Sequence, residues 1–111
     1  MSHPLIDPHT FDELQANAGA DFVAELVETF AEEAPPLLVE MRSAMTSGAA
    51  ERFRRAAHSL KSNSSTFGAS RLAAMARALE LEGMPAEPAA VDALASELEA
   101  TLAALQALAR R

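Results

Sequence analysis

The residues best suited to carry chemistry lie in one short stretch, residues 54–68. Within it, His58 falls on the polar side of a predicted helix, and Lys61 follows one helical turn later on the same face. A neutral imidazole has a free nitrogen lone pair, so it can accept a phosphoryl group and later release it. The neighbouring ammonium can offset part of the negative charge of that group. These residue types and their spacing indicate a phosphoryl-accepting histidine.

Charge is distributed unevenly along the chain. Residues 52–77 contain six Lys or Arg and no Asp or Glu, whereas the rest of the chain holds all sixteen acidic residues and only three basic ones. The formal net charge is -7, and a chain of that charge is not expected to bind nucleic acid without regard to sequence. The basic segment is therefore interpreted as a local site around His58.

Helical geometry turns the His58 side chain away from the core. At about 100° per residue, Phe53, Leu60 and Phe67 share one narrow sector, and His58 lies roughly 140° or more from its centre. Burying the imidazole instead would expose those three side chains, each of which contributes about 1.5–3 kcal/mol when buried. The residues that share the outer side with His58 are Arg54, Lys61 and Ser65.

The simplest alternative for His58 is an ordinary surface histidine in a basic patch. Arg54, one turn earlier, is expected to add a second cation, and Ser62 and Ser65 keep the nearby surface small and polar. A histidine that acts as a general base usually has a carboxylate close by and a closed pocket, whereas this face is cationic and convex. That setting favours phosphoryl transfer to a partner protein over catalysis within a pocket.

Length and composition bound the class of protein. A chain of 111 residues is the size of one domain, so we expect a single domain over residues 1–111, with a flexible arm at 1–9. Half of the residues are hydrophobic and Phe is the only aromatic type, a composition that favours helices. The chain has no Cys and no apolar run long enough for a membrane span. We therefore expect no zinc site. We expect a soluble cytoplasmic protein.

Apolar residues recur at helical spacing along most of the chain. A kink or brief break is expected at Pro35-Pro36, because adjacent prolines remove helix hydrogen bonds. The expected helices cover about 10–17 with Thr10 as cap, 20–47, 49–66 with Gly68 as stop, 70–82 and 89–109. This pattern predicts an all-α fold, an antiparallel four-helix bundle with a short extra N-terminal helix across one end.

The residues around His58 resemble the histidine-containing phosphotransfer (HPt) domain of multistep two-component phosphorelays. The usual motif of that family reads His, any residue, Leu, Lys, Gly, then small residues and a hydrophobic residue before Gly. The similarity extends to an acidic segment at 21–33 and to residues 68–80. Ser62 stands where Gly is usual, and it is expected either to narrow the set of partners that fit or to hydrogen-bond the phosphoryl group. The motif positions that match are His58, Leu60, Lys61, Ser64, Phe67 and Gly68.

The resemblance implies a role for each residue of the site. His58 takes a phosphoryl group from an aspartate of a receiver domain and passes it to an aspartate of another, and Lys61 stabilises the group. Glu80 corresponds by position to the residue that hydrogen-bonds the other ring nitrogen, although a solvated helix carboxylate is the alternative for it. The residues expected to contact the partner are Arg54, Arg55, Ser62 and Ser65.

The resemblance also implies that the chain is a phosphocarrier and not an enzyme. No cofactor is expected in it, and Mg²⁺ is expected in the receiver partner. The expected partners are receiver domains and a hybrid histidine kinase, with no nucleic acid, no membrane and no second copy of the chain. Met1 and the basic end at 110–111 favour a free-standing protein.

Three other functions stay open from the sequence. The chain can be an HPt-like module that docks a receiver or kinase without being phosphorylated. It can be a small phosphatase or hydrolase that uses His58 with Glu80. It can also be a purely structural bundle, which leaves the clustered cations unexplained.

Overall fold

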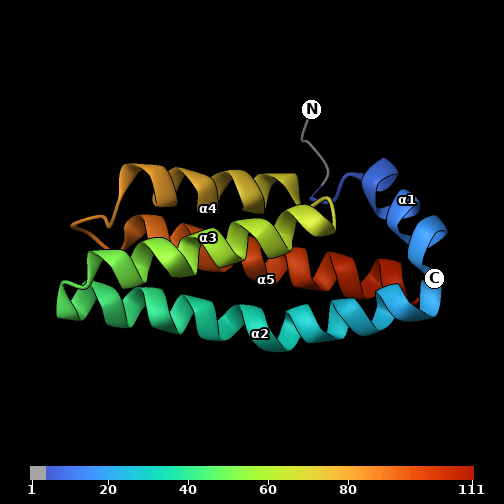
Figure 1. The fold of residues 1–111 in the computed structure, drawn as a ribbon, viewed down its shortest axis with the longest axis horizontal. Coiled ribbons are helices and arrows are strands. Elements are labelled where there is room, and N and C mark those ends of the chain that lie inside the picture. Colours follow the sequence, from blue (N-terminus) through green and yellow to red (C-terminus); the bar gives the residue numbers. More distant parts are fainter. Residues whose placement is uncertain (1–4) are drawn as a thin grey trace.

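The computed structural model describes residues 5–111, and these form five helices and no strands. Helices α2 to α5 run antiparallel and close into a bundle, because α2 and α4 each contact both α3 and α5 (Figure 1). The predicted all-α four-helix bundle is confirmed. The helices are α1 (Pro8–Ala18), α2 (Ala20–Ser47), α3 (Ala50–Thr66), α4 (Ser70–Glu82) and α5 (Ala89–Ala109).

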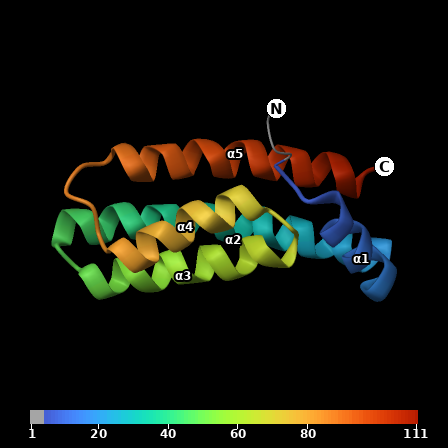
Figure 2. The same ribbon diagram turned by 90° about the horizontal axis from the view of Figure 1, so that it is seen from above.

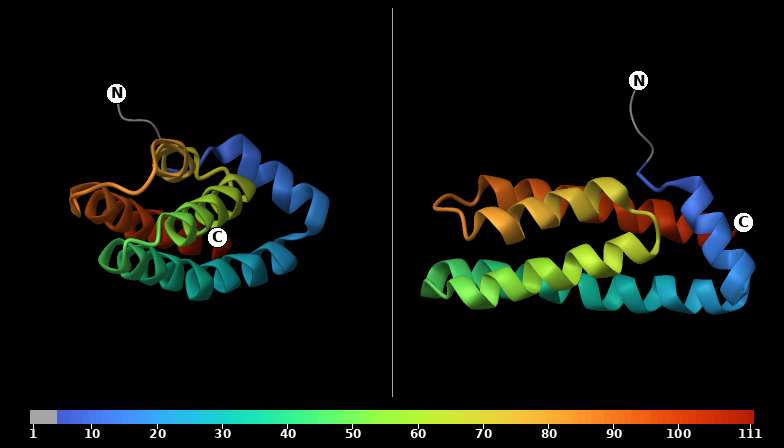
Figure 3. Two further views of the ribbon diagram at one scale, coloured as in Figure 1. Left: turned by 60° about the vertical axis from the view of Figure 1, so that its left-hand side comes forward. Right: turned by 45° about the horizontal axis from the view of Figure 1, so that its top comes forward.

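Helix α1 lies across one end of the bundle, beside the start of α2 and the end of α5 (Figure 3). It begins earlier than the sequence predicted, and its cap is Asp7, not Thr10. The Asp7 carboxylate accepts hydrogen bonds from the His9 backbone N–H at 3.2 Å and from the Thr10 hydroxyl at 2.8 Å. Asp is a strong N-cap and Pro suits the first helical position, which explains why the helix begins here and not after Thr10.

The flexible arm expected at 1–9 does not extend over residues 6–9. Ile6 is buried in the core, and Pro8 and His9 belong to α1. The Asp7 backbone N–H donates to the Gly68 carbonyl at 2.8 Å, which ties the leader to the turn between α3 and α4. Residues 1–4, which include His3, lie outside the described residues.

Helix α2 continues through Pro35 and Pro36 as one helix, so of the expected kink or brief break the break does not occur. Both prolines are exposed, so water can replace the two backbone hydrogen bonds that they remove. Phe30, Ala34 and Leu38 are buried on the opposite side of the helix, before and after the prolines. Packing on both sides of the prolines therefore keeps the helix continuous where two adjacent prolines disfavour it.

Helix α3 presents the predicted apolar stripe to the core. Its inward residues are Phe53, Ala56, Ala57, Leu60 and Ser64, all of them buried. Phe67 follows the helix and stacks at 5.3 Å between ring centroids on Phe30 of α2. Gly68 then ends the segment with φ of 77°, a left-handed conformation that glycine adopts without strain.

Helices α3 and α4 share the most extensive contact in the bundle and lie side by side (Figure 2). Both helices bury small residues among their larger apolar ones: Ala56 and Ala57 on α3, and Ala73 and Ala76 on α4. Small side chains allow two helix axes to approach closely, since the spacing between axes depends on the residues at the contact. A side chain on α4 can therefore reach the outer edge of α3. Within residues 5–111 no helix is both long and apolar enough to span a bilayer.

Candidate functional site

His58 lies in the middle of α3 on the side opposite the buried stripe, and its side chain is 53% exposed. The predicted outward orientation is confirmed. Its inner ring nitrogen, Nδ1, faces α4, and we find no hydrogen-bond partner for its outer nitrogen, Nε2, among residues 5–111. The imidazole thus stands at the edge of the α3–α4 contact, with one nitrogen held and the other open to an approaching group.

Glu80 of α4 is the residue that holds the inner nitrogen. Its Oε2 lies 2.5 Å from His58 Nδ1, and its side chain is only 11% exposed. A nearly buried carboxylate with a partner on another helix is not a solvated surface acid, so that alternative for Glu80 is excluded. The predicted reach of Glu80 across the helix pair is observed, whereas its role in transfer stays a prediction.

Lys61 also turns toward Glu80. Its Nζ lies 3.1 Å from Glu80 Oε1, and its side chain is 27% exposed. The sequence predicted an exposed lysine beside His58, but the ammonium is half-buried and already has a carboxylate partner. Each oxygen of Glu80 therefore has its own partner, His58 on one and Lys61 on the other.

Two opposing effects set the charge of Glu80. Burial raises the pKa of the Glu80 carboxyl, but the hydrogen bonds from Lys61 and His58 lower it by more, so the pKa lies below its ordinary value. The carboxylate is therefore ionised at neutral pH and can only accept hydrogen bonds. Because it can only accept, Nδ1 of His58 must carry the proton that it donates to Glu80. The lone pair of a neutral ring is then on Nε2, the open nitrogen.

Most of the basic residues around His58 are paired with acids that the sequence window does not contain. Arg54 forms a two-point pair with Glu51, with contacts of 2.6 and 3.0 Å, so it is not the free second cation that we expected beside His58. Arg52 binds Glu40 of α2 in the same way, at 2.7 and 3.0 Å. The pair of Arg54 with Glu51 can be predicted from the sequence, since residues three apart meet on a helix. The pair of Arg52 with Glu40 cannot, because it joins two helices.

The four residues predicted to contact a partner are all exposed: Arg54, Arg55, Ser62 and Ser65. Arg55 has no carboxylate within ion-pair distance in the described part of the chain, and the same holds for exposed Arg77 of α4, which the sequence analysis did not single out. A hollow of about 260 Å³ lies between α2 and the C-terminal end of α3. It is lined by Leu26, Thr29, Phe30, Glu33, Asn63, Thr66 and Phe67.

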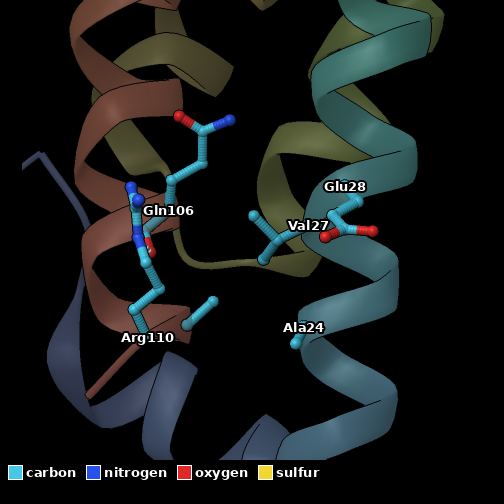
Figure 4. A pocket seen from close by; sticks show the side chains of 6 residues that line it. Ala24, Val27, Glu28, Gln106 and Arg110 are labelled. Atoms are coloured by element: carbon cyan, nitrogen blue, oxygen red, sulfur yellow. Dashed lines mark hydrogen bonds between the residues drawn. The ribbon is translucent and has the colours of Figure 1, made fainter.

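A second hollow of similar volume, about 260 Å³, lies between α2 and α5 (Figure 4). Glu28 lines it on the α2 side, and Gln106 and Arg110 on the α5 side. None of its lining residues belongs to α3 or α4, so it is separate from the His58 site. Across residues 5–111 there is no group of three His, Asp or Glu side chains suited to a metal ion.

The antiparallel bundle displays His58 with its inner nitrogen held by a carboxylate, and its open nitrogen is placed to accept a phosphoryl group. A family model described as "Hpt domain" matches residues 25–108 of this sequence. The chain therefore belongs to the Hpt domain family, as the motif around His58 predicted.

Comparison with solved structures gives the same result. The fold is similar to the crystal structure of histidine-containing phosphotransfer protein B (HptB) from Pseudomonas aeruginosa PAO1, with a TM-score of 0.77 and 28% sequence identity. The match covers 98% of this chain and 94% of that one. No curated protein sequence gives a match. Family and fold together identify a histidine phosphotransfer carrier of two-component phosphorelays, a group of phosphocarriers and not of enzymes.

Proposed function

We propose that His58 accepts a phosphoryl group from an aspartate of one receiver domain and passes it to an aspartate of another. The observation that carries this proposal is the half-exposed imidazole whose inner nitrogen lies 2.5 Å from Glu80. That contact fixes the tautomer in which Nε2 keeps its lone pair. Orientation of the nucleophile before the partner arrives removes part of the entropic cost of the reaction.

The transfer step involves the side chains of the two proteins and the Mg²⁺ ion of the receiver. The Nε2 lone pair forms a bond to phosphorus while the bond from phosphorus to the aspartate oxygen breaks, and that electron pair stays on the carboxylate. The Nδ1 proton remains on the ring. Lys61, one turn from His58, offsets part of the charge of the bound phosphoryl group. The receiver contributes Mg²⁺, and no nucleotide enters the step.

The partner docks on the exposed surface around His58. Arg54, Arg55, Ser62 and Ser65 supply polar and cationic contacts at its rim. The side chain of Ser62, in place of the usual Gly, either excludes some receivers or hydrogen-bonds the phosphoryl group. An interface of this kind is small and transient, which suits a carrier that must release its partner after each transfer. The carrier acts as a cytoplasmic monomer that serves receiver domains and a hybrid histidine kinase.

Incubation with a phosphorylated receiver domain tests this proposal. The expected result is an acid-labile label on the wild type, with none on His58→Gln. Tight binding of the receiver without label in either protein would instead support the module that docks without being phosphorylated. Continuous release of free phosphate in catalytic amounts would support a hydrolase. The receivers of the same organism, compared side by side, would show which of them is the cognate partner.

A further inference from the structure

At this site a single carboxylate, that of Glu80, contacts both His58 and Lys61. Glu80 uses Oε2 for His58 Nδ1 and Oε1 for Lys61 Nζ, at 2.5 and 3.1 Å, and it is only 11% exposed. A carboxylate so poorly solvated needs partners for both oxygens, because an unpaired buried charge is costly. Lys61 is therefore committed to Glu80 before any phosphoryl group is present.

Phosphorylation of His58 changes the charges that Lys61 and Glu80 face. This inference rests on the function proposed above. A phosphoryl group on Nε2 brings a charge of about −1.5 to −2 and three strong acceptor oxygens. Lys61 lies three residues from His58, on the same helix, within reach of that position. The phosphoryl oxygens and Glu80 then compete for one ammonium.

The charge of the imidazole ring decides which group keeps the ammonium of Lys61. When the Nε2 lone pair forms the bond to phosphorus and Nδ1 keeps its proton, the ring becomes an imidazolium cation. Glu80 then faces a full positive charge at Nδ1, where it faced a neutral N–H before. The carboxylate stays neutralised even if the ammonium leaves it. Glu80 therefore has a cation beside it in both states, Lys61 in the free protein and the imidazolium in the phosphorylated one.

We propose that phosphorylation makes Lys61 change partners: it leaves Glu80 Oε1 for the phosphoryl oxygens, while Glu80 keeps the Nδ1–H of the new imidazolium. Glu80 is then a positioning residue with two functions. In the free protein it holds Lys61 ready one turn from the nucleophile. In the phosphorylated protein it retains the ring proton, and the cationic ring leaves phosphorus more readily than a neutral one when the group moves on.

The arginines of α3 and α4 make no ion pair with Glu80 in the described part of the chain. Arg54 is engaged by Glu51 with two contacts, and Arg71 is engaged by Glu97 at 3.1 Å. Arg77, one turn before Glu80 on α4, is exposed and has no ion-pair contact with Glu80. Lys61 is the only lysine of the sequence, so a single side-chain ammonium has to be followed.

The test uses the whole chain, labelled with ¹⁵N and ¹³C in lysine and histidine, and phosphoramidate as a small-molecule phosphoryl donor. Lysine labelling gives one side-chain signal, from Lys61, and the ring nitrogen shifts report where the proton lies on His58. Glu80→Gln is the matched variant, since its amide oxygen can still accept from Nδ1–H but lacks the charge. His58→Gln controls for phosphorylation at other histidines.

In the wild type we expect the Lys61 signals to shift on phosphorylation, and Nδ1 of the phosphorylated ring to stay protonated at mildly alkaline pH. In Glu80→Gln, Lys61 should resemble a free lysine before phosphorylation, and the phosphorylated ring should lose its Nδ1 proton at the same pH. Phosphorylation of His58 without any movement of the Lys61 signals would overturn the exchange and leave the proposed function standing. Absence of phosphorylation at His58 would overturn both.

Discussion

Glu80 on α4 holds the inner nitrogen of His58 on α3, with 2.5 Å between Oε2 and Nδ1. The two residues are 22 positions apart in sequence, so the contact exists only because the two helices pack closely. Both helices bury alanines, and small side chains allow helix axes to approach closely. The chemistry available at His58 is therefore a property of the helix pair and not of the motif alone.

Replacement of Glu80 by alanine should free both tautomers of the His58 ring. The expected results are a change in the ring ¹⁵N shifts and a transfer rate that falls roughly tenfold, which corresponds to a loss of about 1.4 kcal/mol of transition-state stabilisation. Phosphotransfer from a receiver and NMR of the ring measure the two effects. Glu82→Ala, at an exposed position on the same helix, is the control and should change neither. Unmoved ring signals in Glu80→Ala would remove Glu80 from the site.

Lys61→Ala should slow phosphoryl transfer without unfolding the bundle. Because one charge-assisted contact to the phosphoryl group is lost, the rate should fall roughly tenfold. Circular dichroism should still show the helical fold, since the core contains no part of this side chain. Arg42→Ala is the control, because it removes an exposed cation of α2 that pairs with Asp92 of α5. Its transfer rate should match that of the wild type. Equal rates in the two variants would contradict a role for Lys61.

Acidification should weaken the bundle through Glu80. Burial raises the pKa of its carboxyl, but Lys61 and His58 lower it further, so the folded value lies below the ordinary 4.5. A carboxyl with a depressed folded pKa stabilises the protein above its unfolded pKa, and this contribution is lost as the pH falls through the folded value. The unfolding free energies of wild type and Glu80→Gln should thus differ most near neutral pH and converge below pH 4.5. A difference that stays constant into the acid range would show that Glu80 gains nothing from its two partners.

Gly68→Ala should destabilise the protein more than Gly48→Ala. Both glycines have positive φ, 77° and 68°, and alanine in that region costs about 1–2 kcal/mol. A Cβ at Gly68 would also lie 2.8 Å from Thr10 Cβ and 3.1 Å from the Asp7 carbonyl oxygen, whereas a Cβ at Gly48 meets nothing within 4 Å. The crowding should add about 1–3 kcal/mol, measured by urea unfolding. Equal losses of unfolding free energy in the two variants would mean that Asp7 and Thr10 do not pack on the turn at Gly68 in solution.

Much of the fold follows from local pattern. The inward residues of α3 recur at helical spacing and carry no competing signal, so the stripe from Phe53 to Leu60 was predicted and is buried. The bounds of α4 and α5 agree with the predicted ranges, because each follows a turn marked by glycine or proline. The outward direction of His58 follows from the same periodicity.

The deviations arise where tertiary contacts outweigh local preference. Pro35 and Pro36 predict a kink or a brief break, and α2 has no break because the buried residues before and after them pack on the same core. Ile6 looks like part of a free arm until the bundle end covers it. The pairing of Lys61 with Glu80, and of Arg52 with Glu40, joins residues on different helices, so no spacing rule within one helix reveals it.

The most direct measurement is transfer in the outward direction. The protein is phosphorylated on His58, freed of the donor, and mixed with an unphosphorylated cognate receiver domain and Mg²⁺. The account predicts that label leaves His58 and appears on the receiver aspartate in a single round, and that it remains on His58 when the receiver aspartate is replaced by alanine. Label that stays on His58 with the intact receiver, or that is released as free phosphate without passing through the receiver, would contradict the carrier function.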